Sequence, residues 1–330
     1  RGLLDEARYR LGESLFALED RTGALQVWRK LVVAHPVSPW SEQARAQEKG
    51  LEDKLSATEL MERGMGYFHA MRNLKSEADF AAALKTNDMN AEQRCQALFH
   101  RAKSVYKERQ YKRSAPLFVP AIAACQTSGN TNYEVKSAYQ AGLAYSRARE
   151  RKKSARYYAH VELYPEHSYA DDARLRQAEE FDDLGQDEKV TELLSSLPAA
   201  YPKGDMRGEA MWRLARRSYQ AKDYQAAVGW LEQQIKVVPI EINWWAEGQA
   251  HYWLGRSLAH LGKSAEAAKA YGDCIRLYPL TYYSMQAFNR LRESWPEDYK
   301  KLLVEVQAAK SPWKNEPMAR KEYATAAFQS

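Results

Sequence analysis

The side chains that could bind a metal ion or form a covalent link are three cysteines and seven histidines. Cys95, Cys125 and Cys274 form no CxxC motif and lie at no ligand spacing from a histidine, so we expect neither a metal site nor a cofactor. Cys95 and Cys125 could lie on successive helices of one unit and pair, although we favour unpaired thiols. The histidines are scattered along the chain without a carboxylate or thiol at ligand spacing: His35, His69, His100, His160, His167, His251 and His260.

Motifs of nucleophilic, phosphate or metal-dependent catalysis are missing from the sequence. It contains no Gly-rich phosphate loop, no Gly-x-Ser-x-Gly turn and no HExxH. The net charge of +6, from 49 basic and 43 acidic side chains, favours an acidic partner but is too diffuse to predict nucleic-acid binding. The apolar stretch 117–125 contains a proline and is too short to span a bilayer, so we expect no transmembrane segment.

Basic side chains gather in two clusters about 40 residues apart. The first contains Arg101, Lys103, Lys107, Arg109, Lys112 and Arg113, and the second contains Arg147, Arg149, Arg151, Lys152, Lys153 and Arg156. One interpretation is a docking edge for an anionic polymer or an acidic protein. The other, which we favour, is a solvated turn region whose cations lie near helix C-termini, where the helix dipole stabilises them.

Five of the nine tryptophans lie between residues 212 and 253. Trp212, Trp230 and Trp253 have helical spacing, which favours packing between helices. Trp244 and Trp245 are adjacent and cannot both face one helix seam, so at least one is a candidate for surface contact with a sugar ring or a protein partner.

These residues are carried by a spacing that recurs along the chain. A small residue is followed by a second small or apolar residue twelve positions later, and a proline follows after another twelve. The frames are Gly12, Ala24 and Pro36; Gly142 and Ser154; Ala178, Val190 and Pro202; Ala215, Ala227 and Pro239; and Gly255, Ala267 and Pro279. Weaker copies start at Gly66, with Ala78 and Ala82, and at Ala102, with Ser114 and Phe118.

The spacing predicts pairs of antiparallel helices. Small residues let the two helices approach closely, and the proline ends the second helix because it lacks an N–H group. Each pair leaves an apolar face that only the next pair can bury, so about seven pairs predict an all-α, right-handed solenoid in which the first helices line a concave face. The pattern resembles the tetratricopeptide repeat, although repeats starting at 142, 178, 215 and 255 are longer than the family's period of about 34 residues.

The segment 249–291 carries a second, more particular resemblance. Its YWLGR run, the hairpin that follows and the run YPLTYYSMQA resemble the end of the superhelical domain of soluble lytic transglycosylases. That resemblance implies a periplasmic cell-wall protein whose separate catalytic domain cleaves peptidoglycan with one glutamate in a Glu-Ser dipeptide. Glu293 and Ser294 match the dipeptide, but no Gly-Leu-Met-Gln run follows them, so we assign no catalytic residue.

We therefore expect a superhelix over residues 1–291 and a helical extension over 292–330, with helices divided at Pro312, one of them over 317–328. The chain begins at Arg1, and we expect it to be a fragment that precedes a further domain. The function expected is the non-catalytic, periplasmic part of a transglycosylase-like protein that binds peptidoglycan or partner proteins. The alternative is a protein-binding scaffold of a cell-envelope assembly with no enzymatic domain.

Overall fold

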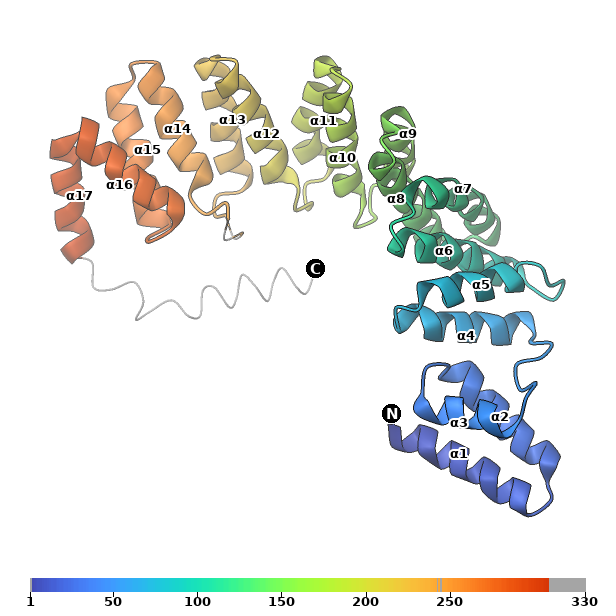
Figure 1. Ribbon diagram of the computed structural model, residues 1–330. Helices are drawn as coiled ribbons and strands as arrows, with labels where there is room; N and C mark the ends of the chain where they lie inside the picture. Colours follow the sequence, from blue (N-terminus) through green and yellow to red (C-terminus); the bar gives the residue numbers. More distant parts are fainter. Residues whose placement is uncertain (1, 242, 244, 309–330) are drawn as a thin grey trace. The chain divides into compact units, whose positions relative to one another are not determined.

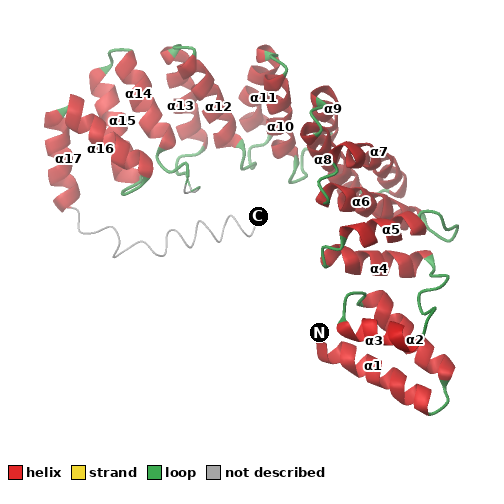
Figure 2. Cartoon of the chain, viewed as in Figure 1, coloured by secondary structure: helices red, strands yellow, loops and turns green. Residues whose placement is uncertain are grey.

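The computed structural model describes residues 2–241, 243 and 245–308, and every regular element in these ranges is a helix (Figures 1 and 2). The chain divides into two compact units, Arg1–Gly204 and Asp205–Ser330. The helices of the first unit are α1 (Gly2–Ala17), α2 (Arg21–Ala34), α3 (Pro39–Gln47), α4 (Ala57–His69), α5 (Asn73–Ala83), α6 (Ala91–Lys107), α7 (Tyr111–Ser128), α8 (Thr131–Arg147), α9 (Arg151–Val161), α10 (Ala170–Asp183) and α11 (Asp187–Ala200). The second unit contains α12 (Arg207–Gln220), α13 (Tyr224–Val237), α14 (Gln249–His260), α15 (Ser264–Leu277), α16 (Tyr282–Ser294) and α17 (Pro296–Ala308).

Consecutive helices pair as antiparallel hairpins, and each hairpin packs on the next within its unit. The predicted all-α solenoid of about seven hairpins is therefore present, with two additions. Helix α3 is inserted after the first hairpin, and α16 and α17 form a further pair. Helix α16 crosses position 291, where we expected the repeat array to end. The helices expected around Pro312 and over 317–328 lie outside the described residues.

One packing rule explains why these sequences form hairpins. A small residue of the first helix is followed sixteen positions later by a large buried residue of the second helix. The pairs are Gly12 with Trp28, Gly64 with Phe80, Ala102 with Phe118, Gly142 with Tyr158, Ala178 with Leu194, Ala215 with Leu231, and Gly255 with Tyr271. A Cβ atom on Gly142 would lie 2.6 Å from the ring of Tyr158, so the large side chain fills the space that the small residue leaves.

The second hairpin corrects one sequence assignment. The small residue that faces the second helix is Gly64, whereas the sequence frame started at Gly66. A Cβ atom on Gly66 would instead lie 2.6 Å from Pro36, in the contact with the first hairpin. Two glycines stand two positions apart on α4, and the spacing alone could not distinguish the contact within the hairpin from the contact between hairpins. Ala78, expected in the core, is consequently exposed.

The ends of the helices follow the predicted turn chemistry. Pro36, Pro202, Pro239 and Pro279 each stand two residues after the last residue of a second helix. The turn inside a hairpin contains one residue with positive φ, which is Gly185 or Gly262 in two hairpins and a non-glycine residue in five: Glu19, Met71, Arg109, Arg149 and Lys222. The N–H of the following residue then reaches back to an unpaired carbonyl of the first helix, as Glu150 does to Tyr145 at 2.9 Å.

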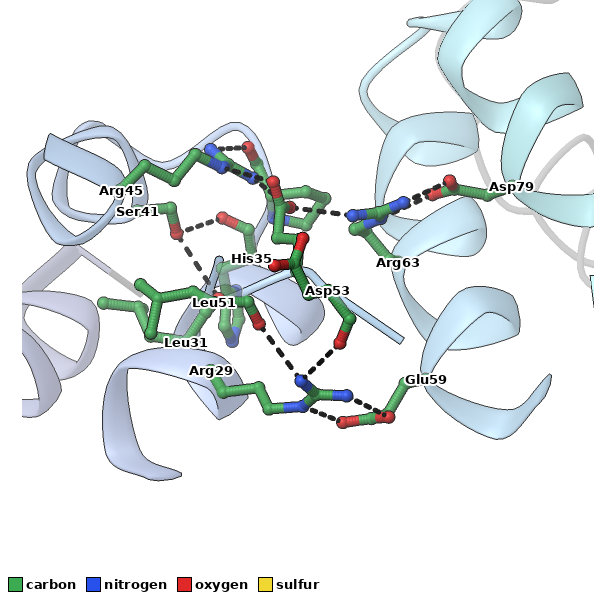
Figure 3. A network of polar contacts seen from close by, with 12 residues as sticks. Arg29, Leu31, His35, Ser41, Arg45, Leu51, Asp53, Glu59, Arg63 and Asp79 are labelled. Carbon is green, nitrogen blue, oxygen red and sulfur yellow. Dashed lines mark hydrogen bonds and ion pairs between the residues drawn. The ribbon is translucent and has the colours of Figure 1, made fainter. Parts of the chain in front are cut away.

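A partly buried polar network attaches α2, α3 and the loop after α3 to the second hairpin (Figure 3). The Arg29 guanidinium donates to the carbonyl of Asp53 at 2.9 Å and to the carboxylate of Glu59. The hydrogen bonds from Arg29 lower the pKa of Glu59 to about 2. Arg63 of α4 bridges Glu52 of the loop, at 2.9 Å, and Asp79 of α5. These polar contacts hold the irregular loop after α3 against α4 and α5, where the loop itself has no helix face to pack.

Two glycine substitutions test the packing rule inside the second unit. Alanine at position 255 places a Cβ atom 2.8 Å from the ring of the buried Tyr271. We expect Gly255→Ala to lower the free energy of unfolding by a net amount of about 1 kcal/mol or more, because overpacking costs about 1–3 kcal/mol. In α13, a Cβ atom on Gly229 meets no atom, so Gly229→Ala should stabilise the unit by about 0.5–1 kcal/mol through helix propensity. Urea unfolding of both variants measures the signs, and equal shifts would contradict the rule.

Candidate protein-binding surface

Three lysines of the first helices α6 and α8 form the most distinctive cationic site in the first unit. Lys103 and Lys107 are one turn apart on α6, and Lys136 lies on α8. Lys107 and Lys136 lie against rings that both contact His100: Lys107 is 3.4 Å from the centre of Phe68, and Lys136 is 5.7 Å from the centre of Tyr133. In the part of the chain that the structure describes, none of the three forms an ion pair with a carboxylate.

Lys103 is held without a negative partner. Its ammonium group donates to Oε1 of Gln140 on α8 at 2.6 Å and lies 5.0 Å from the ring centre of Tyr106. Burial, with a smaller effect of Lys107, lowers the pKa of Lys103 to about 8. The free energy of its charged form is therefore raised, and an anion placed beside it would restore the lost solvation.

Aromatic rings surround the other side of the site. The ammonium group of Lys107 lies 3.4 Å from the centre of the Phe68 ring, and burial lowers its pKa. His100 is 7% exposed, and its Nε2 lies 3.1 Å from the Tyr133 hydroxyl while its buried Nδ1 has no hydrogen-bond partner. Burial lowers the pKa of His100 to about 4, so its ring is neutral at pH 7 and Lys103, Lys107 and Lys136 carry the charge.

This arrangement fits a carboxylate of a peptide better than it fits a reacting substrate. Partly buried cations without carboxylate partners attract an anion, and flanking rings provide surface for apolar side chains. Lys103 and Lys107 belong to the first basic cluster of the sequence. His100 was named only as one of the scattered histidines, and Lys136, Phe68 and Gln140 were not singled out. Their proximity depends on how α4, α6 and α8 stack, which residue spacing along one helix does not show.

Most of the remaining members of the two basic clusters lie at the turns between α6 and α7 and between α8 and α9, but Arg101 lies inside α6 and Arg156 inside α9. Arg109 and Arg149 occupy the turn position with positive φ. Lys112 and Lys152 begin the second helices, are exposed, and form no ion pair within the described ranges. The binding candidates that the sequence suggested for a docking edge at these two turns are Arg109, Lys112, Arg113, Arg149, Arg151, Lys152 and Lys153.

Three of these edge cations are occupied by acidic side chains. Arg113 binds Glu77 of the preceding hairpin, and Arg151 binds Glu180 of the following hairpin at 3.0 Å. Lys153 binds Glu150 at 2.6 Å. The arginines connect neighbouring hairpins, so this part of the edge contributes to stacking. The structure separates the lysine site on the first helices from the edge, whereas the sequence grouped both together.

The tryptophans of the predicted aromatic surface also fall into a packed group and an exposed residue. Trp212, Trp230 and Trp253 are partly buried against Ala215, Leu231 and Ala250 in the second unit. The side chain of Trp245 is 60% exposed, and Trp244 lies outside the described residues.

The segment that carries Trp245 is anchored from inside by Glu241. The Glu241 carboxylate accepts hydrogen bonds from the N–H of Gly248 at 2.9 Å and from Gln234 at 3.0 Å, while its own N–H donates to the Tyr278 hydroxyl. Burial raises the pKa of Glu241 to about 7, against the opposing effect of the backbone N–H groups at the start of α14.

The cysteines differ from the favoured sequence interpretation. Cys95 of α6 and Cys125 of α7 form a disulfide, and both residues are fully buried. Unpaired thiols were favoured because the sequence offers no disulfide framework, but two cysteines on antiparallel helices need only to lie opposite each other. Cys274 is free and buried, and burial raises the pKa of its thiol to about 12.

Glu293, the residue that matches the transglycosylase dipeptide, lies near the end of α16. Its side chain is 57% exposed and lies 3.7 Å from Arg290. Glu293 therefore has the surroundings of an ordinary surface residue, exposed and beside an arginine of its own helix.

The stacked hairpins define a helical-repeat protein, and the comparisons with known proteins give the type of repeat. The tetratricopeptide repeat family model matches residues 6–37 and 249–281, one segment in each unit. Both segments coincide with hairpins that show the small-to-large packing rule. These two segments of the chain are therefore similar to the tetratricopeptide repeat. No curated protein sequence matches it significantly.

Solved structures share this fold at low sequence identity. The C-terminal part of a TPR repeat-containing protein from Cytophaga hutchinsonii is 13% identical, with a TM-score of 0.55 over 84% of this chain and 98% of that chain. The apo form of RapI is 12% identical, with a TM-score of 0.45 over 89% of this chain and 77% of that chain. PilW, a type IV pilus biogenesis factor, is 16% identical, with a TM-score of 0.41 over 70% of this chain and 97% of that chain. Of these three, the Cytophaga protein has a TM-score above 0.5, and its likeness shows the fold alone.

Proposed function

We propose that the protein is a binding scaffold that holds an acidic segment of a partner protein against the first helices α6 and α8. The observation that carries this proposal is the set of three lysines without carboxylate partners, two of which have lowered pKa values. A folded protein loses solvation energy by burying such cations, and an acidic ligand compensates for this loss. The repeat fold provides the extended surface on which such a segment can lie.

We further propose that the protein functions in the cell envelope after export. The Cys95–Cys125 disulfide supports this location, because disulfides persist in oxidising compartments such as the bacterial periplasm. None of the helices described is long and apolar enough to cross a membrane.

A second candidate is the positioning of peptidoglycan or of a peptidoglycan hydrolase, as the resemblance over 249–291 implies. One observation favours it: the aromatic run at the start of α16 presents Tyr282, which is 64% exposed and in ring contact with Tyr283. Exposed aromatic rings of this kind stack on sugar rings. Sedimentation of the protein with isolated cell-wall sacculi, compared with Tyr282→Ser, tests this candidate separately from the lysine site.

The lysine site predicts an unusual dependence of affinity on pH. Lysine is charged below its pKa, so Lys103 loses its charge as the pH rises through about 8. We expect the affinity for a fluorescein-labelled glutamate-rich peptide, measured by fluorescence anisotropy, to fall between about pH 7 and pH 9. Lys103→Arg keeps the charge and should remove this fall, because arginine remains protonated throughout.

Charge removal provides the direct test of the same site. The double substitution Lys103→Met and Lys107→Met should weaken peptide binding by about tenfold or more at neutral pH. Lys30→Met is the matched control, because Lys30 is exposed on α2 and its removal leaves the site intact. An affinity that is the same in the double variant and in the wild type would refute the proposed function.

A further inference from the structure

Helices α7 and α9 are the second helices of two consecutive hairpins in the first unit (Figure 1). Side chains of both helices line a groove. Its volume is about 420 Å³. The walls are mainly apolar: Val119, Ile122 and Ala123 come from α7, and Arg156, Tyr157 and Leu163 come from α9 and the residues after it. Leu163 is 69% exposed and Val119 is 37% exposed, so the groove leaves large apolar side chains in contact with water.

The exposed side of α7 does not resemble an ordinary solvated helix face. Pro116, Val119, Pro120 and Ala123 lie along it at helical spacing, and all four are exposed and uncharged. A helix face in contact with water normally carries charged or polar residues. Proline and alanine lose no side-chain entropy when a partner covers them, so this wall is already ordered for binding. Two prolines inside one helix also weaken it, which makes hairpin stability a poor explanation for them.

The charged residues of α7 and α9 are all basic. Neither α7 nor α9 contains an acidic residue. Lys112, Lys152 and Arg156 are exposed and make no ion pair with another described residue, and Arg156 lines the groove itself. Below the groove, the buried carboxylate of Glu134 already accepts hydrogen bonds from His160 at 2.9 Å and from Tyr164 at 2.7 Å. Arg156 is therefore available to an external anion at the groove.

We propose that this groove binds a partner segment in which a large apolar residue and an acidic residue stand about three positions apart. Leu163 stands seven positions after Arg156 and two after the last residue of α9, which corresponds to roughly 10 Å when the helical rise is extended to it. An extended peptide covers that length in about three residues. The apolar side chain lies against Leu163 and Val119, and the carboxylate reaches Arg156. This site uses the second helices and is independent of the lysine site on α6 and α8.

The test uses a labelled short peptide that contains a leucine and an aspartate three positions apart, and a peptide of the same composition in which they are adjacent. Fluorescence anisotropy with the full chain should show tighter binding of the first peptide. Leu163→Ser and Arg156→Glu should each reduce this affinity by about tenfold, equivalent to ~1.4 kcal/mol. The matched controls are Leu74→Ser, at a leucine that is 61% exposed on the second helix α5, and Lys30→Glu on α2. Both should bind as the wild type does.

Each other outcome would overturn the proposal. Equal affinity for the two peptides would exclude recognition of the spacing, and unchanged affinity in Leu163→Ser and Arg156→Glu would exclude the groove. An equal loss in the control variants would show that the peptide binds by general charge and hydrophobicity. The Lys103→Met and Lys107→Met variant should retain binding of this peptide, which separates failure at the groove from failure of the proposed function. Circular dichroism spectra of all variants verify that they remain folded.

Discussion

Replacing Arg63 by alanine is expected to lower the free energy of unfolding of the first unit by about 3–5 kcal/mol. Arg63 donates two hydrogen bonds to Asp79, one of them from Nε at 2.8 Å, and it is the only hydrogen-bond partner of the Asp79 carboxylate among the described residues. Asp79 is 5% exposed. Its negative charge would remain buried without compensation in the variant, which costs far more than the loss of a surface ion pair.

The comparison uses a surface pair of the same unit and a double substitution. Arg10 pairs with Glu13 on α1 with its side chain 58% exposed, and Arg10→Ala should change stability little. Replacing both buried partners, as Arg63→Met with Asp79→Leu, should recover most of the loss because no charge stays buried. Urea unfolding measures all three variants. If Arg63→Ala is no less stable than Arg10→Ala, the network in Figure 3 does not stabilise the junction between α3 and the second hairpin.

The hairpins could be predicted because their signal is local. Gly142, Ser154 and Tyr158 all lie within seventeen residues. The small and large residues that face each other in one hairpin can therefore be recognised from a short stretch of sequence. Helix α3 could not be predicted in the same way, since it has no partner at the repeat spacing. Its position depends on ion pairs such as Arg45 with Glu52, at 2.9 Å, whose partners come from an irregular loop. Repeat periodicity carries no information about such a loop.

The lysine site was only partly predictable for a related reason. The sequence singled out Lys103 and Lys107 as members of a charged run, but a run along one helix contains side chains that point in different directions. Which of them meet Lys136 and Gln140 is decided by the stacking of α6 on α8. Hairpin stacking likewise explains why Arg113 and Arg151 turn out to be paired: their acidic partners lie on the neighbouring hairpins.

The disulfide, in contrast, follows from the packing rule that pairs a small residue with a large residue sixteen positions later. Ala102 of α6 lies opposite Phe118 of α7, and both are fully buried. Cys95 stands seven residues before Ala102, and Cys125 stands seven residues after Phe118, so each is two helical turns away in the same direction along the antiparallel pair. Once the register of the hairpin is known, the two cysteines must lie opposite each other.

Removing this disulfide should have the second largest effect on stability. The bond closes a loop between residues separated by 30 positions, which restricts the unfolded chain. Cys95→Ala with Cys125→Ala should lower the free energy of unfolding of the first unit by about 2–4 kcal/mol. Urea unfolding with and without dithiothreitol measures the effect: the reductant should destabilise the wild type once it is unfolded and leave the double variant unchanged.

Cys274 provides the internal control for the redox experiment. Its thiol is free, buried and in the second unit, and burial keeps its pKa at about 12, so it should react with a thiol reagent only after unfolding. One reactive thiol per unfolded chain before reduction, and three after it, is the expected titration. Three reactive thiols without reductant would show that Cys95 and Cys125 are not linked. The stability gained from the bond would then be absent, and the support for an oxidising compartment would be lost with it.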